Sequence, residues 1–524
     1  MLKLATIIKK IKLLNYKRFK NYTIEPNEKV NILVGDNEVG KSSILEAIDL
    51  VASGSIRRIE SMGIDRLLNM ESVQAFNADT REFNKLPKLI IELYLSGDFD
   101  HTMNGKNNTD NTTCDGIRLF CGPNLDYLNE INESLREQAE YFPYDYYYIR
   151  FSTFADEGYT GYKKKLRSVL IDNSSMSSDY ATNDFIKRMY SQYTEGNTKE
   201  RAFHKSKYRQ LKNSFRFDSL GALNGRIPDG KNYAFGLKLN SVFGFETDLM
   251  IYENEISIDN KGTGKQVFIK TDFALKHSGD KVDIILLEEP ENHLSHVNLR
   301  KLIDNVSSAQ NGQLFITTHN SLISTRLELN NLLIMHNDSI ECPVSLKDLS
   351  QDTAKYFMKA PVANILEFTI SSKVILVEGA SEYMLFEEFY KIAVGNKPEK
   401  DDVHIIDIRG LSFKRYLELA KLLNNKVAVV TDNDGDKQKN CIDKYSDYAD
   451  CSQIEIFYEE DETKVTFEIV LYNDNKALCD TLFGSTALNY MLGNKTESAY
   501  TLLNQNTVIT VPAYIRGAIK WIRE

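Results

Sequence analysis

Short apolar runs that end in glycine, acidic or other polar residues recur along the chain. The run VNILVG, from Val30, predicts a buried strand, and SILEAIDLVASG, after the loop GDNEVGKS, has apolar residues at helical spacing. The runs IILLEE, from Ile284, and LFITTH, from Leu314, predict two more buried strands. Strands that alternate with helices in this way predict an α/β fold with parallel strands.

A second series of strand and helix patterns begins at SSKVILVEGASE, near residue 372, and continues through DVHIIDIRG and NKVAVVTDNDGD. It predicts a second parallel-sheet domain over 372–524, after a helical connector at 341–371. The first domain is then split into 1–100 and 241–340 by an insertion at 101–240.

The insertion differs in composition from the rest of the chain. It begins with HTMNGKNNTDNTT, a polar segment that predicts an exposed loop. Between Gly161 and Phe217 there are thirteen Lys or Arg against five Asp or Glu, with aromatic residues interleaved. This pattern is typical of a solvated helical face, and equally of a surface for nucleic-acid contact or dimerisation.

Composition narrows the class of protein. A chain of 524 residues with 42% hydrophobic and 26% charged residues predicts a globular protein of two or three domains. No apolar run is long enough to cross a bilayer and no signal-peptide pattern is present, so we expect a cytoplasmic protein without a membrane partner. The seven Lys or Arg before Glu25 leave a transit peptide as the alternative.

Net charge and cysteine content argue against two further properties, a surface that binds DNA everywhere and a set of disulfide bonds. The formal charge of −10 argues against a surface that coats DNA generally, although a local basic patch is compatible with it. The six cysteines include no CxxC pair and predict reduced thiols.

GDNEVGKS fits the phosphate-loop pattern GxxxxGK[ST] and lies between a predicted strand and a predicted helix. Gly35 and Gly40 would let backbone N–H groups approach the phosphates of ATP, Lys41 would neutralise their charge, and Ser42 would ligate Mg²⁺. Asn37 and Ser43 are assigned to the same ATP site.

Acidic residues that follow a buried strand supply the other half of such a site. Glu288 would hold Mg²⁺ and Glu289 would orient the attacking water, while His319, just past the next strand, would sense the γ-phosphate. Two surface carboxylates and a structural histidine are the alternatives.

NKGTGKQ is a second glycine-rich segment, but its spacing does not fit a phosphate loop. Gly262, Gly264 and Gln266 would instead present polar groups to a γ-phosphate held by another subunit. A plain turn is the alternative.

The order of phosphate loop, long insertion, glycine-rich loop, EEPE strand and TTH strand resembles the ATPases related to ABC, SMC and RecF proteins. The resemblance implies a dimer in which two heads sandwich ATP. The chain departs from the family pattern because the sequence LSGGQ is missing and no segment clearly matches the glutamine loop, for which Gln74 is a candidate. His293 and His296 fit the loop that contacts the opposite subunit better than a zinc site.

Four carboxylates follow two strands of the second domain. Glu378, Glu382, Asp432 and Asp434 would converge at the C-terminal edge of a parallel sheet, where ligands bind. Carboxylates that lie so close together repel one another unless cations are bound between them. Their hard oxygen atoms favour Mg²⁺, Mn²⁺ or Ca²⁺. Simple surface acids are one alternative; an EF-hand is another, but Asp443 stands where that loop requires Glu.

A glutamate followed one strand and helix later by DxD resembles a Toprim domain, with Glu378 as the glutamate and Asp432 and Asp434 as the DxD. Arg409-Gly410 falls where Toprim domains have a glycine. Thr466 and Glu468 are similar to the Ser/Thr-x-Glu that completes a second metal site in OLD nucleases. An ATPase fused to a C-terminal Toprim domain is the layout of the OLD family, which includes nucleases of Gabija and retron defence systems.

The OLD family has a catalytic lysine near the C-terminus, whose position here corresponds to Val511, so that Lys520 or Arg516 would have to replace it. The resemblance implies an ATP-controlled, metal-dependent DNA endonuclease that acts against phage, with DNA, a second copy, and either a reverse transcriptase with its small DNA or RNA or a UvrD-like helicase as partners. An ATPase clamp without nuclease activity and a topoisomerase-like or primase-like Toprim enzyme are the alternatives.

Overall fold

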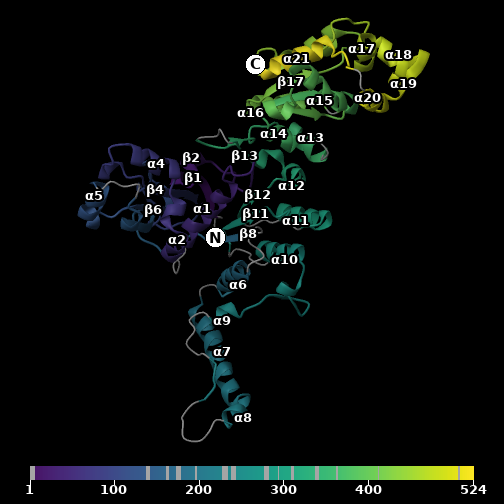
Figure 1. Cartoon of the computed structure of the whole chain (residues 1–524). Coiled ribbons are helices and arrows are strands. Elements are labelled where there is room, and N and C mark those ends of the chain that lie inside the picture. The colour runs from purple at the N-terminus through teal and green to yellow at the C-terminus, as the bar shows by residue number, and fades with distance from the viewer. Residues whose placement is uncertain are drawn as a thin grey trace. The chain divides into compact units, whose positions relative to one another are not determined.

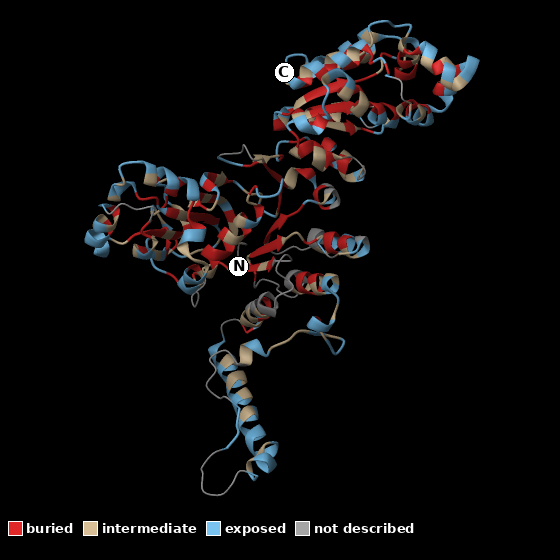
Figure 2. Ribbon diagram, viewed as in Figure 1, coloured by how far each residue is buried: buried red, intermediate tan, exposed pale blue. Residues whose placement is uncertain are grey.

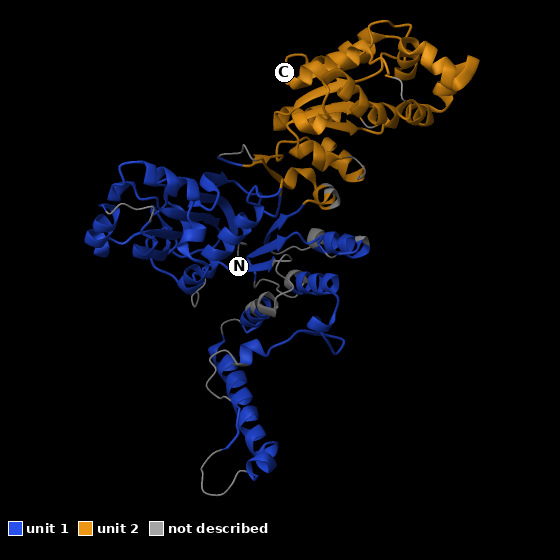
Figure 3. Ribbon diagram, in the orientation of Figure 1, with its two compact units in different colours: residues 1–33, 37–318, 338–342 blue, residues 34–36, 319–337, 343–524 orange. Residues whose placement is uncertain are grey.

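The fold is described from a computed structural model of the chain. It describes residues 6–136, 142–160, 165–172, 179–194, 197–226, 234–237, 244–276, 282–292, 294–308, 312–336, 341–360, 364–410, 412–505 and 508–524. Contacts divide the chain into two compact units (Figure 3), residues 1–33, 37–318 and 338–342 in one and residues 34–36, 319–337 and 343–524 in the other.

The N-terminal part of the chain forms an antiparallel sheet with strand order β2-β1-β4-β6-β5, in which β7 also pairs with β6. Its strands are β1 (Ile7–Tyr16), β2 (Phe19–Ile24), β4 (Leu89–Ser96), β5 (Asn104–Gly105), β6 (Cys114–Pro123) and β7 (Tyr147–Thr153). β1 places Ile11 and Leu13 in the core, as expected for a strand with one buried face.

A second sheet has the order β14-β13-β3-β12-β11-β8, and the strands β3, β12, β11 and β8 are parallel. Its strands are β3 (Val30–Gly35), β8 (Ser168–Asp172), β11 (Ile284–Glu288), β12 (Gln313–Thr317), β13 (Leu332–Met335) and β14 (Val344–Ser345). The strands β3, β11 and β12 are almost wholly buried, which explains why most of their residues are apolar on both faces. The prediction of a parallel sheet in this part of the chain is therefore confirmed.

Helices surround these two sheets (Figure 1). They include α1 (Lys41–Ser53), α2 (Ile56–Met62), α4 (Met70–Ala78), α5 (Leu128–Arg136), α10 (Thr263–Lys276), α11 (His296–Ser308) and α12 (Ser321–Arg326). The helix α1 buries nine of its residues, so the helix that follows the phosphate loop also belongs to the core.

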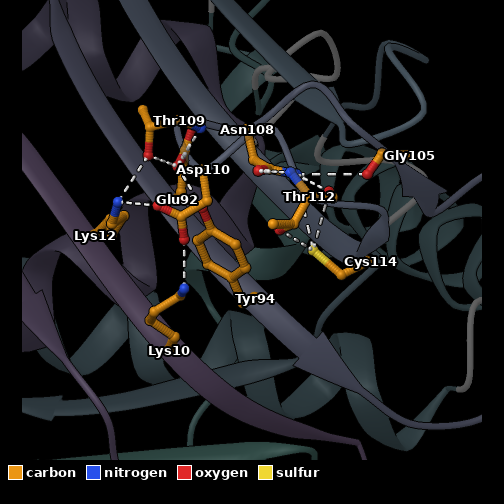
Figure 4. A network of polar contacts seen from close by, with 10 residues as sticks. All are labelled: Lys10, Lys12, Glu92, Tyr94, Gly105, Asn108, Thr109, Asp110, Thr112 and Cys114. Carbon is orange, nitrogen blue, oxygen red and sulfur yellow. Dashed lines mark hydrogen bonds and ion pairs between the residues drawn. The ribbon is translucent and has the colours of Figure 1, made fainter.

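The polar segment after β4 is tied to the sheet by a buried carboxylate (Figure 4). Glu92 is 0% exposed. It accepts hydrogen bonds from Thr109 N at 3.0 Å, Thr109 Oγ1 at 2.7 Å and Tyr94 OH at 3.1 Å. Asp110 pairs with Lys10 and Lys12 beside it. The segment is mostly exposed, as expected, but it is anchored because a buried carboxylate requires hydrogen-bond donors.

Four described helices lie in the basic segment and just after it. They are α6 (Asp179–Tyr193), α7 (Thr198–Asp218), α8 (Gly221–Asn224) and α9 (Gly244–Thr247). No residue of α7 is buried, as Figure 2 shows by the absence of red on this helix. The side chains of Phe203 and Phe217 on α7 are 58% and 67% exposed. The predicted basic helical insertion is present, and its long helix is exposed along its full length.

The expected connector consists of α13 (Gln351–Lys359) and α14 (Ile365–Ile370), followed by a parallel sheet of order β16-β15-β17-β18. The strands β15 (Lys373–Val377), β16 (Val403–Asp407), β17 (Lys426–Val430) and β18 (Ile454–Phe457) alternate with α15 (Ala380–Val394) and α16 (Phe413–Leu423). The second parallel-sheet domain is thus also confirmed.

The C-terminal segment of the chain is helical and completes the core of this domain. It contains α17 (Phe467–Asp474), α18 (Lys476–Phe483), α19 (Ala487–Gly493), α20 (Lys495–Leu503) and α21 (Ala513–Arg523). Leu471, Leu502 and Ile515 pack in one cluster with Ile375 of β15 and Phe386 of α15. Among the described residues, no helix is long and apolar enough to cross a membrane.

Candidate functional site

The phosphate loop stands where the sequence predicts it, between the end of β3 at Gly35 and the start of α1 at Lys41. Gly40 has a φ of 96°, and a Cβ there would lie 2.5 Å from the ring of Phe19. Only glycine fits this position without strain. The side chain of Lys41 is buried while Ser42 is exposed, and the helix N-terminus that follows the loop is suited to a phosphate.

The remaining loop residues are placed as follows. Asn37 is exposed and Ser43 is half-buried. The backbone carbonyl of Glu38 accepts a hydrogen bond from Arg18 Nη1, which ties the loop to the turn between β1 and β2. The loop is thus held from a neighbouring element as well as by its own strand and helix.

Glu288 and Glu289 lie at the same edge of the parallel sheet as the phosphate loop. Because β12 alone separates β3 from β11, the carboxyl ends of β3 and β11 are roughly 10 Å apart. Glu289 has a φ of 40°, and its carboxylate accepts a hydrogen bond from Asn292 Nδ2 at 2.6 Å. A nonglycine residue at positive φ stores strain of the kind found at functional sites.

The other residues assigned to the ATPase site lie in two segments. His319 follows β12 and is exposed. Gly262 immediately precedes α10, whereas Gly264 and Gln266 lie in its first turn, and Gln266 Nε2 donates to the carbonyl of Lys261 at 2.8 Å. The glycine-rich segment thus leads into a helix, and its assignment to a nucleotide stays a prediction.

Three residues discussed with the ATPase resemblance complete this part. His296 is the first residue of α11, and His293 lies outside the described residues. Gln74, the candidate for the glutamine loop, is exposed on α4.

The second unit brings its acidic residues together at the carboxyl ends of two adjacent parallel strands. Glu378 follows β15, and Asp432 and Asp434 follow β17. Glu378 Oε1 accepts hydrogen bonds from Thr431 Oγ1 at 2.5 Å and from the backbone N of Asp432 at 3.3 Å. These contacts join the strand-end glutamate directly to the DxD segment.

Two further carboxylates of this cluster are on helices and are buried. Glu382, in the first turn of α15, is 9% exposed, and Glu468, in the first turn of α17, is 3% exposed. Glu468 Oε2 accepts a hydrogen bond from Lys495 Nζ at 3.0 Å. The cluster therefore contains a lysine that no sequence motif indicated.

The carboxylates lie close enough to affect one another's ionisation. Burial raises the pKa of Asp432 to about 8, with further contributions from Glu378, Glu382, Glu468 and Asp434. Burial likewise raises the pKa of Glu382 to about 7, with contributions from Glu468 and Glu378. Carboxyl groups that lie close together resist losing their protons. A divalent cation bound among them would stabilise their ionised forms.

Thr466 provides an independent observation in favour of an ion at this place. Its Oγ1 is buried without a hydrogen-bond partner, although the residue precedes the first turn of α17. A hydroxyl and carboxylates are the oxygen donors that Mg²⁺, Mn²⁺ and Ca²⁺ use. Within the described residues, no three His, Cys, Asp or Glu side chains are already arranged to hold a metal ion.

The buried side chain of Asn433 fixes the DxD segment through hydrogen bonds. Asn433 is 1% exposed, and its Nδ2 donates to the carbonyls of Glu459 at 2.8 Å and Asp461 at 3.2 Å. These acceptors belong to the acidic run at 459–462, which the segment therefore adjoins. On the other side, Gly410, with a φ of 71°, donates its N–H to the carbonyl of Glu378 at 3.2 Å.

The basic residues expected near the C-terminus are exposed. The Lys520 side chain is 81% exposed and lies 3.9 Å from Glu524, and Arg516 is also exposed. Val511 is buried in the core of the domain. Tyr514 on the same helix has its pKa raised by burial and by Asp432 and Glu382, which places its phenol near the acidic cluster. The catalytic role assigned to Lys520 or Arg516 stays a prediction.

The raised carboxyl pKa values predict how stability depends on pH. Asp432 and Glu382 keep their protons in the folded state at pH values where the unfolded chain has lost them, so stability falls as pH rises toward 8. With a chelator present, the free energy of unfolding should fall by about 2 kcal/mol or more between pH 6 and pH 9. Denaturant titrations at each pH measure this, and an Asp432→Asn/Glu382→Gln variant should lose most of the slope. An equal slope in that variant would contradict the assignment.

Comparison with known families agrees with the division of the chain into an ATPase part and a C-terminal parallel-sheet domain. Residues 7–220 match the AAA ATPase domain, and residues 370–434 match the Toprim domain of proteins like the overcoming lysogenization defect (OLD) protein. Curated relatives include the DNA replication and repair protein RecF of Clostridium beijerinckii, 36% identical over 16% of this chain and 22% of that protein. RecF of Alkaliphilus oremlandii is 30% identical over 13% of this chain and 19% of that protein. The matches thus span about a fifth of the length of these relatives.

Among solved structures, an SMC head bound to the C-terminal winged-helix domain of ScpA has 16% identity and a TM-score of 0.34, over 67% of this chain and 99% of that one. The C-terminal region of the Xanthomonas campestris pv. campestris OLD protein has 20% identity and a TM-score of 0.22, over 29% of this chain and 92% of that one. The two family matches lie in the order in which the two parallel sheets occur. The chain therefore carries an AAA ATPase domain followed by an OLD-like Toprim domain.

Proposed function

We propose that the chain is an ATP-controlled, divalent-metal-dependent DNA endonuclease. The observation that carries the proposal is the cluster formed by Glu378, Glu382, Asp432 and Glu468, in which burial and the neighbouring carboxylates raise the pKa values of Asp432 and Glu382. Carboxylates gathered at one edge of a parallel sheet repel one another and so lower the stability of the fold. A role in binding cations explains why they are there. The OLD-like Toprim match of this segment supports the same function.

In this proposal each residue of the cluster has a separate task. Glu378, Asp432 and Asp434 would hold a divalent ion, with Glu382 as a further ligand and Thr466 and Glu468 on the other side of the site. When bound, Mg²⁺ or Mn²⁺ activates water and stabilises the leaving oxygen of a phosphodiester. Thr431 would orient Glu378 through the hydrogen bond between their side chains.

The ATPase part would control the nuclease through nucleotide binding. Lys41 and the backbone around Gly40 would hold the phosphates, Ser42 and Glu288 the Mg²⁺ ion, and Glu289 the attacking water. Gly262, Gly264 and Gln266 would complete the site of a second copy, so we infer a homodimer. ATP binding would then shift the population of assembled dimers and thereby cutting.

The exposed helix α7 is our candidate for DNA contact. Over Thr198–Asp218 it carries seven Lys or Arg and two Asp or Glu, against a net charge of −10 for the whole chain. Some of these side chains, such as Lys212 over the ring of Tyr208, lie beside aromatic rings. Two such basic helices from two copies would repel each other, so this charge favours a phosphate backbone over a second copy as the partner.

Reversing charge on α7 should weaken DNA binding in a salt-dependent way. We expect Arg209→Glu/Lys212→Glu to lower affinity for duplex DNA about tenfold or more and to reduce the salt slope of log K by about 2, because two phosphate contacts are lost. Fluorescence anisotropy over a range of NaCl concentrations measures both. A Lys397→Glu/Lys400→Glu variant changes the net charge equally and should retain binding. If the α7 variant binds DNA normally but loses its dimer, the helix is a dimerisation surface instead.

The nuclease proposal is tested on plasmid DNA. The purified chain should convert supercoiled plasmid to nicked or linear product in Mg²⁺ or Mn²⁺ and should be inactive in EDTA. Absence of cutting under all nucleotide conditions, with ATP still hydrolysed, would support the ATPase clamp. A covalent protein–DNA adduct after denaturation would support the topoisomerase-like enzyme.

The biological setting belongs to the same proposal. We propose that the protein acts in the cytoplasm as an antiviral defence effector, in a retron or Gabija system. Its partner would be a reverse transcriptase with its small DNA or RNA, or a UvrD-like helicase. Plating phage on bacteria that express the chain with and without each partner tests this, and unchanged plaque counts in every combination would contradict it.

A further inference from the structure

Lys495 is the one residue of the acidic cluster described above to which the proposed function gives no task. It is the first residue of α20, and its Nζ lies 3.0 Å from Glu468 Oε2. The Glu468 side chain is 4% exposed, whereas that of Lys495 is 52% exposed, so an ammonium reaches a buried carboxylate from the surface. Asp432 and Glu382 also interact electrostatically with this ammonium.

Glu468 and Thr466 are the residues that would hold a second divalent ion in the proposed nuclease. With Lys495 in place, Glu468 Oε1 and the unpaired Thr466 Oγ1 are the oxygens that these two residues still offer. A Mg²⁺ ion takes six oxygen ligands, so an ion held by one free carboxylate oxygen and one hydroxyl would have to take the other ligands from water or substrate. An ion bound there would also lie within a few ångströms of the ammonium, and two cations at that distance repel each other strongly.

We propose that the ammonium of Lys495 takes the place of the second divalent ion at Glu468, so that the Toprim site of this chain binds one divalent ion tightly. That ion would be held by Glu378, Asp432 and Asp434. Lys495 is then a positioning residue, because it fixes the carboxylate that faces the DxD segment. The inference rests on the proposed metal-dependent function and specifies how many ions that function uses.

Counting bound ions tests the inference without measuring cleavage. Isothermal titration calorimetry with Mn²⁺, on the full chain without nucleotide, should give one tight site per chain for the wild type. Lys495→Met removes the charge and should gain a second site, with the affinity for the second ion at least tenfold higher than in the wild type. Lys495→Arg retains the charge and should bind one ion. Lys520→Met, the same substitution at an exposed position, should also bind one.

Each other result has a definite meaning. Two tight sites in the wild type, or one in a folded Lys495→Met chain, would overturn the inference and leave the nuclease proposal intact. No Mn²⁺ binding by any chain would overturn the metal-dependent function itself. Lys495→Gln can hydrogen-bond with Glu468 without a charge, and it replaces Lys495→Met if circular dichroism shows that the methionine variant is unfolded.

Discussion

Asp432→Ala should abolish metal-dependent cleavage of plasmid DNA, lowering the rate at least about a thousandfold, and should leave ATP hydrolysis unchanged. The side chain lies between Glu378, Glu382 and Glu468, all of which contribute to its raised pKa, so its removal deprives the site of its shared ligand. Gel assays of nicked and linear product under single-turnover conditions measure the loss, and phosphate release measures the ATPase in the same preparation.

The matched control is Asp447→Ala. Asp447 belongs to the same domain, and its side chain is 79% exposed and 3.9 Å from Lys414. This variant should cut at the wild-type rate. If Asp432→Ala also cuts at that rate, a contaminating nuclease or a different site is responsible, and the acidic cluster is not the active site.

Lys41→Ala should reduce ATP binding and hydrolysis at least about a hundredfold, because this buried lysine, the first residue of α1, is the cation that we propose to contact the phosphates. Nucleotide binding is measured with a fluorescent ATP analogue and turnover by phosphate release. Lys20→Ala, at an exposed position on β2, is the control and should retain both.

The same variant shows how the two domains communicate. Metal-dependent cutting should survive in Lys41→Ala but no longer respond to added ATP, since nucleotide sets the population of the dimer and not the chemistry at the acidic site. Cutting that still responds to ATP in a variant that binds none would contradict control through the phosphate loop.

The two parallel sheets were predictable because their strands are buried on both faces. The strands VNILVG and KVILV consist mostly of apolar residues, and each is followed by the residues that a sheet of this kind presents to a ligand. The same reasoning brought Glu378 and Asp432 together from segments more than fifty residues apart, and the hydrogen bond from Asp432 N to Glu378 confirms that they are neighbours.

What the sequence did not indicate are the contacts made by single residues from unrelated elements. Lys495 begins a helix in a segment without a motif, and only the tertiary fold brings it to Glu468. Glu92 interrupts the apolar run of β4 in the way an outward-facing residue would, and yet it is 0% exposed because the segment around Thr109 covers it. A periodic pattern records burial by the sheet and not burial by a loop that is distant in sequence.

The attachment of Asn433 to the segment at 459–462 has a consequence for how substrate is captured. Those four residues, Glu-Glu-Asp-Glu, give this rim of the proposed cleavage site four carboxylates, of which Glu460 is paired with Lys437, and the remaining negative charge would repel a polyanion during its approach. A Toprim domain with such a rim would capture DNA slowly by itself. Most of the favourable free energy of DNA binding would then come from another part of the chain. Cutting would be confined to DNA that is already bound there.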